Sequence, residues 1–217
     1  VVTPGVYDTL VQVAATYIVI FIVFAAFLEA YGAMDYFVRI GAKVGSYVKS
    51  GITQTAVVTS VAMGSVNGSA AANAATTGAF TIPLMKDAGV RAESAGAIES
   101  VASTSGQVLP PVMGAGAFIM ASLITGITYV DVIIAGLIPA AILLISIFLA
   151  VHYVAAPQIG ATDPSDHLDD TMATASIAFE SVKYGIPLFV LIYYLGIVQY
   201  TVMTSALYTA VSMIGMG

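Results

Sequence analysis

The sequence predicts an all-α integral membrane protein, with spanning helices around a re-entrant helical hairpin and a discontinuous, unwound helix. Hydrophobic residues make up 59% of the 217 residues, charged residues make up 8%, and the mean hydropathy is +0.98. Such a composition is typical of chains that lie in lipid. Two apolar segments, residues 52–85 and 91–125, are interrupted by glycine, serine, asparagine and proline where a simple spanning helix carries leucine and valine.

Composition also excludes several classes of site. The chain has no cysteine, so disulfides, thiolate zinc sites and thiol catalysis are excluded within it. Its formal charge is −6, and residues 163–170 hold a cluster of acids that we interpret as a solvated loop. No basic segment precedes the first apolar run, so we expect no signal peptide. We expect a fragment of a longer protein, since apolar sequence runs up to Gly217.

Residues 1–50 are expected to hold a spanning helix and an interfacial helix. Residues 10–28 are uncharged and, at about 1.5 Å per residue, are just long enough to cross a hydrocarbon core of roughly 30 Å. Residues 36–48 carry Arg39 and Lys43 at helical spacing. This pattern suits a short helix that lies in the membrane interface.

Residues 51–125 are expected to form one unit with two breaks. In residues 52–85, each arm is too short to span comfortably, so we predict a re-entrant hairpin that turns at residues 65–69. In residues 91–125, Pro110 and Pro111 lack N–H donors, so carbonyls of residues 103–106 are expected to lose helical partners. Irregular backbone is tolerated in a bilayer only where it is buried in protein or lines a watery cavity. In transporters such interruptions mark the substrate and ion site.

The remaining sequence predicts a spanning helix over residues 126–155, an acidic loop over residues 156–180, and a second spanning helix with a truncated end over residues 181–217. Within the last part, the apolar element is expected over residues 186–206. With a re-entrant hairpin, all the basic residues fall on one membrane face, which the positive-inside rule identifies as cytoplasmic. These residues are Arg39, Lys43, Lys49, Lys86, Arg91 and Lys183.

The two breaks carry the residue types that a hard cation needs. Sodium takes oxygen ligands from carbonyls, hydroxyls and amides. If the breaks meet, helix N-termini at Ser69 and after Pro111 also point their positive ends at one place, which favours an anionic group there. The sequence therefore suggests a carboxylate substrate with coupled sodium.

Three runs resemble a known family over roughly residues 50–125. They are GSVNGSAAAN at residues 64–73, GAFTIPLMK at residues 78–86 and ASTSGQVLPPVMGA at residues 102–115. These runs resemble the large membrane subunit of TRAP (tripartite ATP-independent periplasmic) transporters, and most of all the fused permeases of the TAXI branch. The family has two inverted repeats, whereas this chain shows one hairpin and one unwound helix.

The resemblance implies half of an elevator-type secondary transporter in the inner membrane. It implies sodium-driven import of an organic acid, dicarboxylate or amino-acid-like, delivered by an extracytoplasmic substrate-binding protein. Other expected partners are the rest of the permease, including the second inverted repeat and small-subunit-like helices, and membrane lipid. We expect no nucleic-acid partner and no cofactor besides the coupling sodium ion.

The resemblance also implies the site residues. The expected sodium ligands are Ser65, Asn67, Gly68, Ser103, Thr104 and Gly106. The expected substrate-binding residues are Asn67, Ser69, Asn73, Ser105, Gln107 and Pro110.

Other polar residues leave alternatives open. Glu99 is either a buried proton or cation site or an interfacial acid near its helix start. Asp131 is interpreted as a charge at a helix N-terminus, and His152 and His167 as solvent-facing. Two other functions are weighed: a non-transporting membrane scaffold, and an intramembrane hydrolase using Ser69 with His152. No serine-hydrolase pattern surrounds Ser69, so we expect no enzyme.

Overall fold

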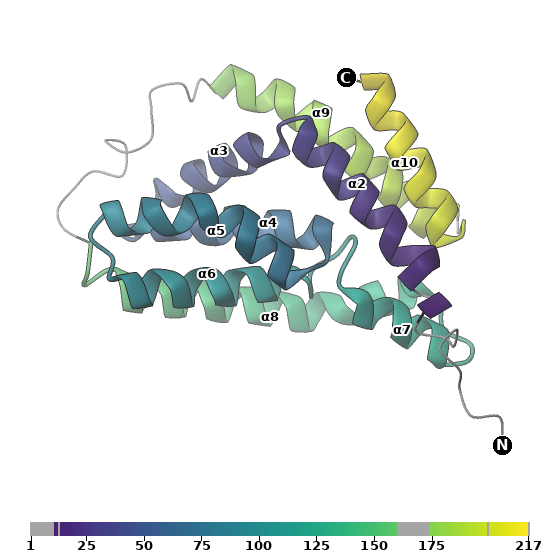
Figure 1. Ribbon diagram of the computed structural model, residues 1–217, viewed down its shortest axis with the longest axis horizontal. Helices are drawn as coiled ribbons and strands as arrows, with labels where there is room; N and C mark the ends of the chain where they lie inside the picture. The colour runs from purple at the N-terminus through teal and green to yellow at the C-terminus, as the bar shows by residue number, and fades with distance from the viewer. Residues whose placement is uncertain (1–10, 13, 160–173, 199, 217) are drawn as a thin grey trace.

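The computed structural model describes residues 11–12, 14–159, 174–198 and 200–216, and all regular structure in them is helical (Figure 1). The prediction of an all-α protein is thus confirmed for this part of the chain. Residues 160–173, which contain His167 and most of the predicted acidic loop, lie outside the described residues. The helices are α2 (Val19–Ala30), α3 (Ala33–Gly45), α4 (Gly51–Asn67), α5 (Ala70–Asp87), α6 (Ala92–Gly106), α7 (Ala115–Leu123), α8 (Tyr129–Ala155), α9 (Thr174–Ile192) and α10 (Val202–Met216), with π-helical turns at Ala14–Ile18 and Tyr193–Ile197.

Helices α4, α5, α6 and α8 form one bundle with nearly parallel axes (Figure 1). Helices α4 and α5 are the arms of a helical hairpin, and α6 packs against both. Their shared core includes Ile52, Val57, Met85, Ile98 and, from α8, Val151. Because apolar side chains of all four helices meet in this core, the hairpin is held against α6 and α8 as a unit.

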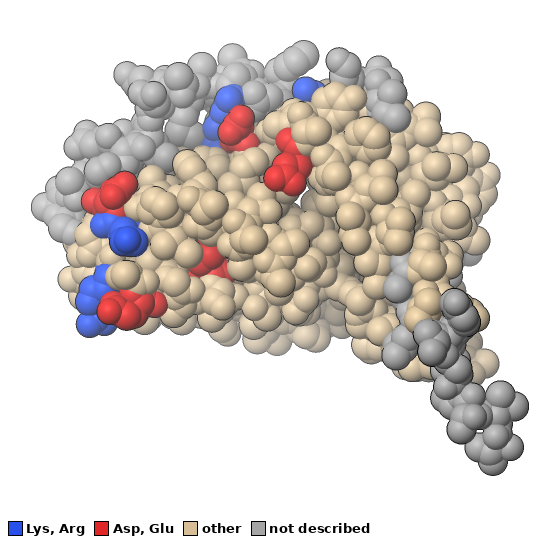
Figure 2. Space-filling model, in the orientation of Figure 1, with Lys and Arg blue, Asp and Glu red and all other residues tan. Residues whose placement is uncertain are grey.

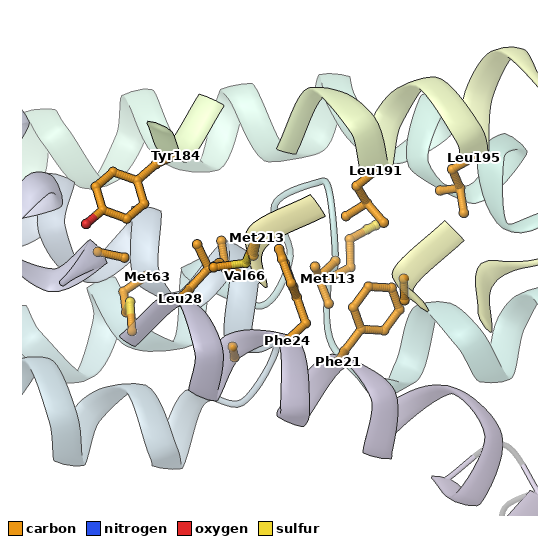
Figure 3. Close-up of a cluster of buried hydrophobic side chains, with 14 of the residues drawn as sticks. Phe21, Phe24, Leu28, Met63, Val66, Met113, Tyr184, Leu191, Leu195 and Met213 are labelled. Atoms are coloured by element: carbon orange, nitrogen blue, oxygen red, sulfur yellow. The ribbon is translucent and has the colours of Figure 1, made fainter. Parts of the chain in front are cut away.

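Helices α2, α9 and α10 form a second group, inclined to the first (Figure 1). Figure 3 shows the core that they share with the far end of α4: Phe24 and Leu28 of α2 lie near Met213 of α10, Leu191 of α9 and Val66 of α4. The C-terminal end of α4, at Met63 and Val66, is therefore buried between both groups.

Among the described residues, α8 alone is long and apolar enough to cross a membrane by itself. Helices α2 and α3 pass the same test as a pair, but they are bent by 73° at their junction. Gly32 at this bend has φ +87°, a conformation that glycine adopts without steric cost. Ile138 and Ile142 of α8 are 73% and 61% exposed, as expected of a helix face that meets lipid. On the face in Figure 2, most acidic and basic side chains gather toward one end and one edge, and a single acidic patch lies nearer the middle.

Two predictions about the C-terminal part are wrong. Helix α9 begins at Thr174, inside the loop expected over residues 156–180, and the apolar element expected over residues 186–206 is broken before α10 begins at Val202. The chain reverses direction between the two helices. As a result, Tyr208 of α10 stacks on Tyr194, with ring centroids 5.0 Å apart. Helix α10 then packs against α9 and α2. The continuous apolar pattern predicts one helix here, but the packing of α10 against distant parts of the chain favours two.

Candidate functional site

The tip of the hairpin is built from three consecutive residues. Helix α4 ends at Asn67, and Gly68 follows with φ +64°. Ser69 then caps α5, where its Oγ accepts a hydrogen bond from the N–H of Ala72 at 3.3 Å. The Asn67 Oδ1 atom accepts from the N–H of Ser69 at 3.1 Å. Two amides at the start of α5 therefore have side-chain partners, which fixes the turn.

The second break separates α6 from α7 over residues 107–114. The carbonyls of Ser105, Gly106 and Gln107 accept from N–H groups within this break at 3.0, 3.0 and 2.6 Å. The sequence predicts that carbonyls here lose helical partners, and the structure shows that turn hydrogen bonds replace them. The carbonyls of Gly106 and Gln107 each accept one such bond and so retain a lone pair for a further ligand, whereas the carbonyl of Ser105 also accepts from the N–H of Gln107.

The hairpin tip and the α6–α7 break are in direct contact. The N–H of Val112 donates to the carbonyl of Ser65 at 3.2 Å. A Cβ atom at Gly68 would collide with the carbonyl oxygen of Met113. Below the tip, a Cβ at Gly106 would lie 2.7 Å from the Cα of Gly64, so α4 and α6 cross backbone to backbone. The glycines at these positions allow the two breaks to meet.

A cavity of about 1150 Å³ opens beside this contact. Its polar lining includes Asn67, Ser69 and Gln107, and the first residues of α5 also face it. Apolar side chains of α2, α7 and α8 form the rest of the wall, and Asp131 lies at its α8 side. The cavity thus combines amide and hydroxyl groups, a helix N-terminus and an apolar wall.

A second polar cluster lies inside the bundle, around Glu99. This side chain is 2% exposed. Its Oε1 atom accepts from the hydroxyls of Ser60, Thr77 and Ser103 at 2.8, 2.6 and 2.8 Å. Its Oε2 atom accepts from the hydroxyl of Thr81 at 2.6 Å. Helices α4, α5 and α6 all contribute to this cluster, which gives the buried carboxylate hydrogen-bond donors in place of water.

The predicted site residues separate into two places. Asn67, Gly68, Ser69 and Gln107 line the cavity, and Ser65 and Gly106 lie at the adjoining contact between the breaks. Asn73 and Ser103 are 0% and 1% exposed and belong to the Glu99 cluster, where Asn73 Nδ2 lies 3.1 Å from Ser103 Oγ.

The other predicted ligands take no part in the cavity lining. The hydroxyls of Thr104 and Ser105 donate to carbonyls of their own helix, at 2.7 Å in both cases, and Pro110 is half-buried within the break. Such bonds back to the helix are the ordinary choice of serine and threonine in helices.

Sequence reasoning left the position of Glu99 open and missed its hydroxyl partners Ser60, Thr77 and Thr81. A signal was present, since Thr77 and Thr81, like Glu99 and Ser103, are four residues apart and so share a helix face. Ser60 has no such local signal, because α4 approaches only through tertiary packing.

Two further interpretations concern α8. Asp131 accepts hydrogen bonds from the N–H and hydroxyl of Thr128, both at 2.7 Å, in a capping box at the helix start. This agrees with its interpretation as an N-terminal charge. His152 is not simply solvent-facing: its side chain is half-buried, and Nδ1 lies 2.9 Å from Ser50 Oγ.

The structure also separates Ser69 from His152. Asp131 lines the same cavity as Ser69, and His152 follows it along α8 at a distance of about 30 Å, from a rise of about 1.5 Å per residue. A hydrolytic serine needs its base within hydrogen-bond reach. The arrangement required for an intramembrane serine hydrolase is therefore not formed by these two residues.

Comparison with known proteins agrees with these observations. The family model described as "Tripartite ATP-independent periplasmic transporter, DctM component" matches residues 1–217. A comparison with curated proteins gave no match. The DctM family consists of membrane permease components of transporters and not of enzymes. The chain belongs to this family and is a membrane permease component of a TRAP transporter.

Proposed function

We propose that the chain is part of a sodium-coupled, binding-protein-dependent secondary transporter that imports organic acids. The observation that carries the proposal is the contact of the hairpin tip with the α6–α7 break beside a cavity. Broken helices that meet in this way expose backbone oxygens and helix ends at one place, which is the arrangement that transporters use to bind ion and substrate together. A membrane scaffold has no need of two such breaks in contact.

Neutral oxygen atoms support sodium as the coupling ion. In the described part of the chain, no group of three or more His, Cys, Asp or Glu side chains lies close enough to hold a metal ion. A cation at the tip would therefore rest on carbonyl, hydroxyl and amide oxygens, of which Asn67, Ser65 and Gly106 offer a set. Sodium accepts such ligands, whereas transition metals prefer nitrogen or sulfur.

The cavity wall supports an organic anion as substrate. The N-terminus of α5 faces the cavity and carries roughly half a positive charge, which favours a carboxylate. Gln107 and Ser69 provide hydrogen-bond groups, and Phe21 and Phe118 provide an apolar surface for a carbon skeleton. We propose that a substrate carboxylate lies against the first turn of α5.

The remaining assignments rest on the resemblance of residues 50–125. We propose a TAXI-type permease with an elevator mechanism, in which α4 and α5 are re-entrant and the basic loops are cytoplasmic. An extracytoplasmic substrate-binding protein, a second inverted repeat and small-subunit-like helices are its proposed partners, and lipid covers the apolar face of α8. The cavity would then be completed by the second repeat.

Uptake of labelled organic acids into proteoliposomes tests the proposal, with the complete permease and its binding protein present. We expect uptake to require a sodium gradient and to fall at least tenfold in Asn67→Ala. Ser146→Ala is the matched control, because its hydroxyl only bonds its own helix, at 2.8 Å from the carbonyl of Ile142. Uptake that ignores sodium, or that is equal in the two variants, would sink the proposal, and absence of uptake in every condition would favour a scaffold.

A further inference from the structure

The Glu99 cluster is connected to the hairpin tip by a chain of hydrogen bonds. Asn73 lies between them: its Nδ2 atom is 3.1 Å from both Ser60 Oγ and Ser103 Oγ, and its Oδ1 atom accepts from Asn67 Nδ2 at 3.3 Å. Asn67 in turn accepts from the N–H of Ser69 at 3.1 Å. Residues that line the cavity are thus joined to a carboxylate buried in the bundle.

The direction of this chain follows from the chemistry of Glu99. A carboxylate is only an acceptor, and a hydroxyl has one hydrogen and two lone pairs. The single hydrogens of Ser60 and Ser103 are both used within the cluster, because each hydroxyl lies 2.8 Å from Glu99 Oε1 and the two hydroxyls lie 2.8 Å from each other. Whichever of these contacts each hydrogen makes, only lone pairs are left for Asn73, so both hydroxyls accept from its amide nitrogen.

Asn73 needs these acceptors because its amide group has two hydrogens. The carbonyl of Ser60, at 2.7 Å, takes one of them. The other has only the hydroxyls of Ser60 and Ser103 within reach, and they accept it because their own hydrogens are held by Glu99 and by the contact between the two hydroxyls. With both hydrogens held in the cluster, the Oδ1 atom of Asn73 is turned toward Asn67. The donors then run in one direction, from the N–H of Ser69 through Asn67 and Asn73 to Ser103 and Glu99. Hydrogen bonds in such a chain polarise and so strengthen one another.

We propose that Glu99 is a positioning residue for the hairpin tip, and that its carboxylate acts through Asn73 to hold Asn67 in the orientation that shapes the binding cavity. The inference rests on the proposed function only in taking the tip as the binding region. Glu99 itself is buried and does not line the cavity, so it would act without touching ion or substrate.

No other ionisable group contributes to this network among the described residues. Helix α4 carries no ionisable side chain, and α5 carries Lys86 and Asp87 only in its last turn. Helix α6 carries Glu93 in its first turn. On α8 the ionisable residues lie at the two ends, Tyr129 and Asp131 at the start and His152 and Tyr153 near the finish. The hydrogen-bond partners of Glu99 are all hydroxyl groups, so the acceptor character of the carboxylate sets the direction of the chain.

The exposure of the tip to a thiol reagent tests the inference. These 217 residues contain no cysteine, so Ala70→Cys, half-buried beside the tip, gives a single reporter once any cysteine elsewhere in the complete permease is replaced. The rate of maleimide labelling is measured without sodium and without substrate. In this background, Glu99→Gln should raise the rate roughly two- to tenfold, the range that loss of one buried hydrogen bond gives. The exposed Glu93→Gln on the same helix should leave the rate unchanged.

Two variants that each remove one hydroxyl partner of Glu99 distinguish positioning of Asn67 through Asn73 from a general loosening of the helix bundle. Ser103→Ala and Thr81→Val each remove one hydroxyl from Glu99, but only Ser103 also contacts Asn73. Ser103→Ala should raise the labelling rate above wild type, and Thr81→Val should not. If Glu99→Gln does not reach the membrane, this comparison alone decides.

A double-mutant cycle gives the final test. If Glu99 acts through Asn73, Glu99→Gln should have no further effect on labelling in an Asn73→Ala background. An undiminished effect in that background, or equal effects of Thr81→Val and Ser103→Ala, would overturn the inference. Labelling is measured without sodium, so its result can be interpreted even if uptake proves independent of sodium. Uptake that is independent of sodium would count only against the proposed function.

Discussion

Replacing Gly68 with alanine tests the contact between the two breaks most directly. The residue has φ +64°, and a Cβ atom there would collide with the carbonyl oxygen of Met113. The left-handed conformation costs an alanine roughly 1–2 kcal/mol. Displacing a packed backbone carbonyl adds roughly 1–3 kcal/mol, as overpacking does elsewhere. We therefore expect Gly68→Ala to lower the free energy of unfolding by about 2–5 kcal/mol.

Gly96→Ala is the matched control. Gly96 lies within α6, and a Cβ atom there would meet nothing within 4 Å. Since alanine is the better helix former by roughly 1 kcal/mol, this control should be as stable as the wild type or slightly more stable. Both variants are heated in detergent, and the apparent melting temperature is read from the loss of monodisperse protein.

Transport gives a second readout of the same change. If the tip moves away from Met113, the ligands proposed for sodium separate, so Gly68→Ala should raise the sodium concentration needed for half-maximal uptake. The reasoning is refuted if Gly68→Ala and Gly96→Ala melt at the same temperature and respond alike to sodium. That outcome would mean that the tip and the break do not touch in the membrane.

Three other predictions concern single contacts, all measured by the same thermal assay. Gly106→Ala places a Cβ 2.7 Å from the Cα of Gly64, and should cost roughly 1–3 kcal/mol by forcing α4 and α6 apart; stability equal to wild type would show that the helices are not in backbone contact. Tyr129→Phe removes the hydroxyl that donates to the carbonyl of Val112, and should cost about 1 kcal/mol, whereas an unchanged melting temperature would argue that the carbonyl finds water. Thr128→Ala removes the side-chain cap of α8 and should cost about 1 kcal/mol, with Thr128→Ser as the variant that restores stability.

Local chemistry in the sequence determined the positions of the two breaks. Gly68 and Ser69 end one helix and cap the next because glycine adopts a positive φ and serine offers an oxygen to free amides. Pro110 and Pro111 interrupt the second element because they lack N–H groups. The apolar composition, together with the uncharged run of α8 between Asp131 and His152, determined that the protein lies in a membrane.

Only the tertiary structure decided where these pieces meet. The hydroxyl of Ser60 reaches Glu99 from a separate helix, and nothing in the residues next to Ser60 indicates it. The reversal before Val202 depends on the packing of α10 against α9 and α2, so a continuous apolar run predicted a single helix instead. Periodicity and turn residues act over a few residues, whereas the burial of a carboxylate or the return of a helix depends on contacts between residues far apart in the chain.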